Sequence, residues 1–159
     1  MTERHWFALA ELGARADVGN WPDFEPAVLG GFGVEHNRVR WLAHAGVGKK
    51  VQLPVPGGGT LDVSLMRFDL ALSYRLTSGA WMLEPGISAE LEVTRASGRD
   101  FNPAAQSALA LSAVGLGRVA REISAGVRGW AELGAGIPVL RPRWVLADGE
   151  QVHRFGPFW

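Results

Sequence analysis

Hydrophobic and polar side chains alternate with a period of two residues from Met66 to Leu76. The even positions hold Met, Phe, Leu, Leu, Tyr and Leu, and the odd positions hold Arg, Asp, Ala, Ser and Arg. Successive side chains of a strand point to opposite faces of a sheet, whereas a helix repeats about every 3.6 residues. The alternation therefore predicts a β-strand with one apolar face and one charged face.

The segment from Trp81 to Thr94 repeats this pattern. Its apolar positions are Trp81, Leu83, Pro85, Ile87, Ala89, Leu91 and Val93, and the alternate positions are Met82, Glu84, Gly86, Ser88, Glu90, Glu92 and Thr94. The turn-forming residues 77–80 separate the two segments, which predicts a β-hairpin. If Ser78 and Gly79 are the central residues of the turn, Arg67 lies opposite Glu90 and Ser73 lies opposite Glu84.

The same alternation predicts further strands over residues 6–15, 28–35, 39–48 and 122–135. Residues 103–120 are ambiguous, because Asn102 and Pro103 are typical of a helix start whereas Gly115 and Gly117 favour a strand. We expect a strand over about Ser107 to Leu116. Short connections are expected near residues 36, 78 and 118, and long loops over 17–26, 49–60, 95–106 and 141–157.

Short turns at one end and long loops at the other are typical of an antiparallel, up-and-down transmembrane β-barrel. The sequence thus predicts an all-β meander with about seven to eight strands present. Four aromatic residues lie at the strand ends next to the expected short turns, and their side chains share the apolar face of the strands. They are Trp6, Trp41, Tyr74 and Trp81. Membrane barrels carry belts of aromatic residues at such positions. A soluble antiparallel barrel or sandwich that binds an apolar ligand inside is the alternative, and there Phe68 and Ile87 would point inward.

Composition narrows the choice of function. The 159 residues correspond to one domain, 1–159. Lys+Arg and Asp+Glu are both 16, so nucleic acid is not an expected partner. There is no cysteine, and no metal or cofactor site is predicted. No signal peptide is visible, which argues against export unless the N-terminus is incomplete.

In a membrane barrel the polar face lines the interior, so the charged side chains would form a lumen network. We expect its members to be Arg67, Asp69, Arg75, Glu84, Glu90, Glu92, Arg128 and Glu132, with Glu11, Arg15, Glu35, Arg40, His44 and Glu122 on the same face. Such residues could line a selective pore or plug the barrel. An eight-stranded barrel is only just wide enough for side chains, which favours a plug.

Catalysis is not expected. A lipid-modifying barrel would need a serine, a histidine and an acid close together, and Ser112 and His36 qualify only by residue type. The run Gly57-Gly58-Gly59 lacks the lysine and helix of a phosphate-binding loop. On the long loops, Trp21, Phe24 and Trp144 could contact a surface partner, although such residues more often pack a loop against the rim.

One stretch resembles a known class of proteins. The run from Ile137 to Trp144, followed by Val152-His153-Arg154 and Gly156-Pro157, resembles the last long loop of uncharacterised bacterial outer-membrane β-barrel proteins. The segments 83–92 and 126–135 are similar to the strands before that loop, so the resemblance covers about the second half of the chain. It implies a location in the outer membrane of a Gram-negative bacterium, with the lipid bilayer as partner and a structural or surface-interaction role. A closing strand that ends in an aromatic residue is lacking, so we expect a chain truncated at both ends.

Overall fold

Seven long strands form one antiparallel meander in the computed structural model of the chain. The model describes residues 6–17, 25–54, 59–77, 79–99, 106–124, 127–140, 143–145 and 151–154. The strands are β1 (Trp6–Asp17), β2 (Glu25–His36), β3 (Val39–Gly48), β5 (Thr60–Tyr74), β6 (Trp81–Arg99), β7 (Gln106–Ser124) and β8 (Val127–Leu140). The short strand β4 (Val51–Pro54) pairs with the start of β5, and β9 (Arg143–Val145) pairs with β10 (Gln151–Arg154). Among the described residues, no helix is long and apolar enough to span a membrane.

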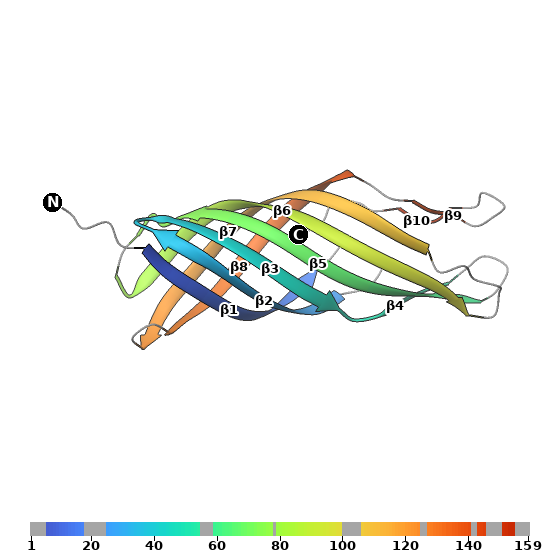
Figure 1. The fold of residues 1–159 in the computed structure, drawn as a ribbon, viewed down its shortest axis with the longest axis horizontal. Coiled ribbons are helices and arrows are strands. Elements are labelled where there is room, and N and C mark those ends of the chain that lie inside the picture. Colours follow the sequence, from blue (N-terminus) through green and yellow to red (C-terminus); the bar gives the residue numbers. More distant parts are fainter. Residues whose placement is uncertain are drawn as a thin grey trace.

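The sheet curls into part of a barrel, with strands tilted against its long axis (Figure 1). The β2–β3, β5–β6 and β7–β8 connections lie at one end, which we call the short-turn end. The opposite end, called the long-loop end, carries β4, β9 and β10 (Figure 1). At the β2–β3 turn, Asn37 adopts a left-handed backbone conformation with φ of 59°, which asparagine tolerates better than most residues. The predicted antiparallel meander is confirmed.

Four predicted connections were wrong in whole or in part, and one of them is the predicted loop 95–106, whose first residues belong to β6. The predicted loop 49–60 contains β4, whose Leu53 is buried, and the predicted loop 141–157 contains the paired strands β9 and β10. The turn expected near residue 118 lies instead between Ser124 and Val127, because β7 continues to Ser124 with an irregularity after Glu122. The segment 122–135, predicted as one strand, is therefore divided between β7 and β8. Residues 107–116 do form a strand, as expected, and it is part of the longer β7.

The predicted register of the central hairpin was wrong by two residues. Arg67 lies opposite Glu92, not Glu90, and Ser73 lies opposite Gly86, not Glu84. The cause is the wider connection held by Thr77. Its hydroxyl donates to the carbonyl oxygen of Trp81 (3.2 Å) and accepts from the amide of Leu83 (2.9 Å). A shift of two residues keeps every side chain on its predicted face.

A small apolar core lies on the concave side at the long-loop end. It consists of buried side chains from four neighbouring strands, Leu53, Val63, Leu65, Ala96 and Ala110. At this end the sheet therefore has the polarity of an ordinary soluble protein, with apolar residues inside.

The edge strands β1 and β8 do not pair with each other in the described sheet. Because seven strands alternate in direction, β1 and β8 run the same way. Side chains nevertheless approach across the gap, since a Cβ added to Gly13 on β1 would lie 2.9 Å from Trp130 on β8. The gap is therefore narrow at this level, and direct antiparallel pairing of the two edges is ruled out by their directions.

Candidate functional site: a charged concave face and an apolar convex band

The concave face carries the charged side chains, in cross-strand rows set by the strand register. One row crosses six strands in the order Glu11, Gly31, His44, Asp69, Glu90 and Ser112. The neighbouring row towards the short-turn end is uncharged, with Gly33, Leu42, Ala71, Ser88 and Val114. The row after that contains Glu35, Arg40 and Ser73. A row of uncharged residues therefore separates two charged groups of rows, which we call tiers.

Glu11 joins the two tiers. Its carboxylate is 2.8 Å from Nη1 of Arg118, 3.2 Å from Nε2 of His44 and 3.7 Å from Nη1 of Arg40. Nδ1 of His44 lies 2.8 Å from a carboxylate oxygen of Asp69, so both ring nitrogens face carboxylates. An imidazole can donate from both nitrogens only in its protonated form. Glu11 thus binds side chains of β3 and β7 at once.

Arg118 is the centre of this network and is 2% exposed. Besides Glu11, it contacts the Glu132 carboxylate at 2.9 Å, and its guanidinium lies 4.5 Å from the ring centroid of Trp130. Two carboxylates and an aromatic face offset the cost of burying this charge. Arg118 and Trp130 were missed among the predicted site residues. The turn placed at residue 118 hid Arg118, because it removed this residue from the strand that contains it.

The tier at the short-turn end is built around Glu35 and Glu84. Glu35 accepts hydrogen bonds from Arg40 (3.1 Å), Arg128 (3.1 Å) and Arg75. Glu84, which is 1% exposed, lies 2.8 Å from Arg40 and 3.4 Å from Arg75. The predicted members Arg75, which follows β5, Glu84 on β6 and Arg128 on β8 are thus brought together, and each carboxylate meets more than one guanidinium.

The second tier lies nearer the long-loop end and is centred on Arg67. Its guanidinium contacts Glu92, directly opposite, and Glu90, diagonal to it, each at 3.1 Å. Arg15 on β1 reaches across the concave side to Glu90 at 2.6 Å. The predicted residues Arg67, Glu90 and Glu92 therefore belong to one buried cluster, which links β1 to β6, whereas Asp69 lies opposite Glu90 and pairs with His44.

Gly31 makes room for this cluster. A Cβ at that position would lie 2.1 Å from Cδ2 of His44 and 2.7 Å from the carbonyl oxygen of Ala43. The Ala43 backbone cannot move away without disturbing the β2–β3 ladder. Glycine at this position therefore allows the imidazole of His44 to lie flat against β2 between its two carboxylates.

Two cavities lined by described residues lie where the edge strands β1 and β8 face each other, and both extend towards the concave side. The first, of about 270 Å³, is bordered by Arg15, His44, Asp69 and Glu132, and the second, of about 230 Å³, by Phe7, Arg40 and Arg128. Trp130 borders both. Each is smaller than the roughly 300–1,000 Å³ of a usual ligand pocket.

The convex face carries the large apolar side chains, and its apolar band ends sharply. Across β5, β6 and β7, the row Met66, Val93 and Leu109 is directly followed towards the long loops by the row Ser64, Arg95 and Ser107. Within the band, Leu70 is 67% exposed and Ile87 is 64% exposed. Beyond the boundary the convex face is polar, and Gln52 donates to Asp62 (3.0 Å). From one row to the next, the convex face therefore changes from apolar to polar.

The predicted aromatic residues lie on the convex face at the short-turn end. Trp6 stacks on His36, with ring centroids 4.2 Å apart, and lies 6.1 Å from Trp41. Tyr74 ends β5 and Trp81 begins β6, where the Arg121 guanidinium lies 5.2 Å from the Trp81 ring centroid. All four are exposed, at 41–63%. They mark the other limit of the apolar band.

The two residues considered for catalysis are not brought together. The row of Ser112 meets β2 at Gly31, whereas His36 is at the end of that strand beside Trp6. Among the described side chains, no group of three or more His, Cys, Asp or Glu is arranged to hold a metal ion. Trp21, Phe24, residues 57–58 and the side chain of Trp144 lie outside what the structure describes. Comparison with protein-family models, curated proteins and solved structures finds no match.

Proposed function

We propose that this chain forms a small transmembrane β-barrel in the outer membrane of a Gram-negative bacterium, with a structural or surface-interaction role and no catalysis. The observation that supports this most directly is the reversal of polarity at the row Met66, Val93 and Leu109. On the short-turn side of that row the apolar residues are outside and the charges inside. On the long-loop side of that row, apolar residues are inside and polar residues are outside, as in a soluble protein. A bilayer edge at this level accounts for both halves.

The height of the band fits a bilayer. On β5 it runs from Met66 to Tyr74, which is nine residues. A membrane-spanning strand needs about 9–11 residues when tilted. The exposed aromatic residues at the short-turn end would then lie at one interface, and the Ser64, Arg95 and Ser107 row at the other.

In the soluble alternative, the apolar side chains of each strand would point to the concave face and the charged ones to the convex face. An apolar ligand inside a soluble barrel would need apolar residues on the concave face over most of its length. Phe68, Leu70, Leu72 and Ile87 instead point outward, and Arg67 and Glu90 point inward. Charged side chains occupy the space where such a ligand would bind. We therefore favour the membrane barrel.

A membrane barrel also requires closure, because unpaired backbone groups cost several kcal/mol each in hydrocarbon. Since β1 and β8 run in the same direction, one further strand, antiparallel to both, would close the sheet as an eight-stranded barrel. The interior would be plugged by the Glu11–Arg118 pair and its neighbours. The long loops, β4 and the β9–β10 hairpin would project from the membrane, where a surface partner could bind.

Two arginine substitutions on one strand test the proposal. Leu70→Arg places a charge inside the apolar band, and Ser64→Arg places the same charge beyond its boundary. A charge at the bilayer midplane costs about 2–4 kcal/mol on the lipid face of a barrel, falling to about 0–1 at the interface. We expect Leu70→Arg to reduce folding into phospholipid vesicles and Ser64→Arg to leave it unchanged. Equal effects of the two changes, or a monodisperse monomer in buffer without detergent, would contradict a membrane location.

A further inference from the structure

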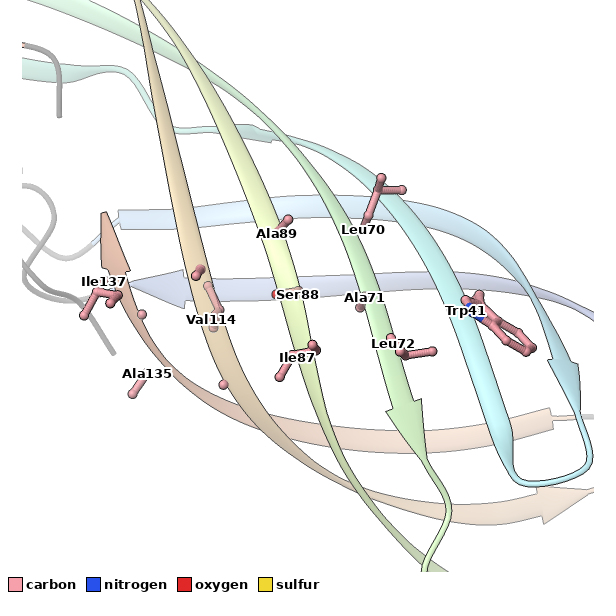
Figure 2. Close-up of a pocket in the computed structure, with 13 residues that line it drawn as sticks. Trp41, Leu70, Ala71, Leu72, Ile87, Ser88, Ala89, Val114, Ala135 and Ile137 are labelled. Carbon is pink, nitrogen blue, oxygen red and sulfur yellow. The ribbon is translucent and has the colours of Figure 1, made fainter. Parts of the chain in front are cut away.

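A hollow of about 860 Å³ interrupts the convex face of β5–β8. Figure 2 shows its lining residues between Trp41, close to the β2–β3 turn, and Ile137, near the end of β8. Its volume lies within the roughly 300–1,000 Å³ of usual ligand pockets and exceeds that of either cavity bordered by Trp130. Apart from Ser88, every lining residue is apolar or glycine.

The strand register explains why the surface is hollow here. One convex row runs Trp41, Leu72, Ile87, Gly115 and Ala135, and the next runs Leu70, Ala89, Ala113 and Ile137. The first row has large side chains on β3, β5 and β6 and small residues on β7 and β8, and the second row has large side chains at both ends with two alanines between them. The small residues form the floor, and the large side chains form the walls.

We propose that this hollow binds one acyl chain of a membrane phospholipid, a site that rests on the membrane location proposed above. A hollow on the lipid-facing side of a barrel must be filled by something apolar, because water there would have no hydrogen-bonding partners. No charged side chain lines it, so the chain of the lipid is bound rather than its headgroup.

The position of the hollow gives the lipid a direction. Trp41 borders one end and belongs to the exposed aromatic residues at the short-turn end, close to Trp6. Tryptophan and tyrosine lie at headgroup level in membrane proteins. The headgroup is therefore placed at the short-turn end, and the acyl chain extends from Trp41 towards Ile137.

A second copy of the chain fits the hollow less well. Two copies related by a two-fold axis place the same patch of each against the other. Contact centred here would set hollow against hollow and leave a void, which loses the packing that drives association in lipid. A flexible hydrocarbon chain can fill the space without this constraint.

Two glycines on β7 offer a matched test. A Cβ at either Gly115 or Gly117 would meet nothing within 4 Å, so a larger residue fits the fold at both positions. Both have the parity of the convex face, but only Gly115 lines the hollow. Gly115→Leu would fill the floor, and Gly117→Leu would add the same side chain beside it.

The measurement is native mass spectrometry of the protein released from micelles that contain dipalmitoyl phosphatidylethanolamine. We expect the wild type and Gly117→Leu to retain one phospholipid and Gly115→Leu to lose it. Equal retention by all three would overturn the proposal, and so would dimers of the wild type that Gly115→Leu abolishes. If Gly115→Leu does not fold, Ala135→Leu fills the same floor from β8.

Failure of the site and failure of the membrane location are distinguishable. If all variants fold into vesicles with equal yield and retain lipid alike, only the acyl-chain site is wrong. If none folds into vesicles and the wild type remains dispersed in buffer, the membrane location is wrong, and the site fails with it.

Discussion

Replacing Arg118 with methionine should destabilise the protein more than any other single change in the charged network. The side chain is 2% exposed and contacts Glu11 at 2.8 Å, Glu132 at 2.9 Å and the ring of Trp130. Methionine has a similar length and no charge, so the main effect is to leave two carboxylates without this partner.

The magnitude follows from what each carboxylate retains. Breaking a buried ion pair costs about 3–5 kcal/mol when the remaining charge has no other partner. Glu11 keeps His44 at 3.2 Å and Arg40 at 3.7 Å, and the Glu132 side chain is 29% exposed, so water screens it. We therefore expect the free energy of unfolding to fall by about 3 kcal/mol, the lower end of this range. With a urea dependence of about 1–3 kcal/mol per molar, the midpoint of unfolding falls by about 1–3 M.

The assay is urea unfolding of the protein folded in phospholipid vesicles, followed by tryptophan fluorescence. Arg121→Met is the matched control, because this arginine lies on the same strand but points outward and is exposed. Adding Glu11→Gln to Arg118→Met should recover stability, with a coupling free energy of about 1–3 kcal/mol in the double-mutant cycle. Additive effects, or a loss for Arg118→Met no larger than for Arg121→Met, would refute the central role of this arginine.

Two further predictions concern register and close packing, and both use the same urea assay. Arg67→Ala and Glu92→Ala should be non-additive by about 0.5–3 kcal/mol, because the two residues are directly opposed; independent losses would show the register to be wrong. Gly31→Ala should destabilise by about 1–3 kcal/mol, because its Cβ would overlap the imidazole of His44. Gly30→Ala, whose Cβ would come no closer than 3.9 Å to any atom, is its control and should have little effect; equal losses at both glycines would rule out the overlap as the cause.

The faces of the strands could be predicted from the sequence because side-chain direction in a strand depends only on parity. The alternation of apolar and charged residues along β5 is enough to predict that Leu70 points outward and Arg67 points inward. An error of two residues in register, as at the Thr77 connection, leaves this result unchanged. The antiparallel order follows in turn from connections too short for a crossover.

The charge partners could not be predicted in the same way. The ion pair between Glu11 and Arg118 joins residues 107 positions apart, and it depends on strand tilt and on how far the sheet curls. Strand ends were also missed where local signals conflict. Pro54 and the glycines of 57–59 suggested a loop throughout, although Val51–Pro54 pairs with β5. The limit of the apolar band emerges only when Ser64, Arg95 and Ser107 are aligned by register into one row.

The most direct test of the membrane location uses the absence of cysteine in the chain. Single cysteines at positions 64 and 70 of β5, each carrying a nitroxide, report by electron paramagnetic resonance which of two relaxing agents reaches them in vesicles. Oxygen partitions into hydrocarbon, and a nickel chelate stays in water. We predict that oxygen dominates at Leu70→Cys and the nickel chelate at Ser64→Cys. Nickel access at position 70 equal to that at position 64 would show that the apolar band does not face lipid.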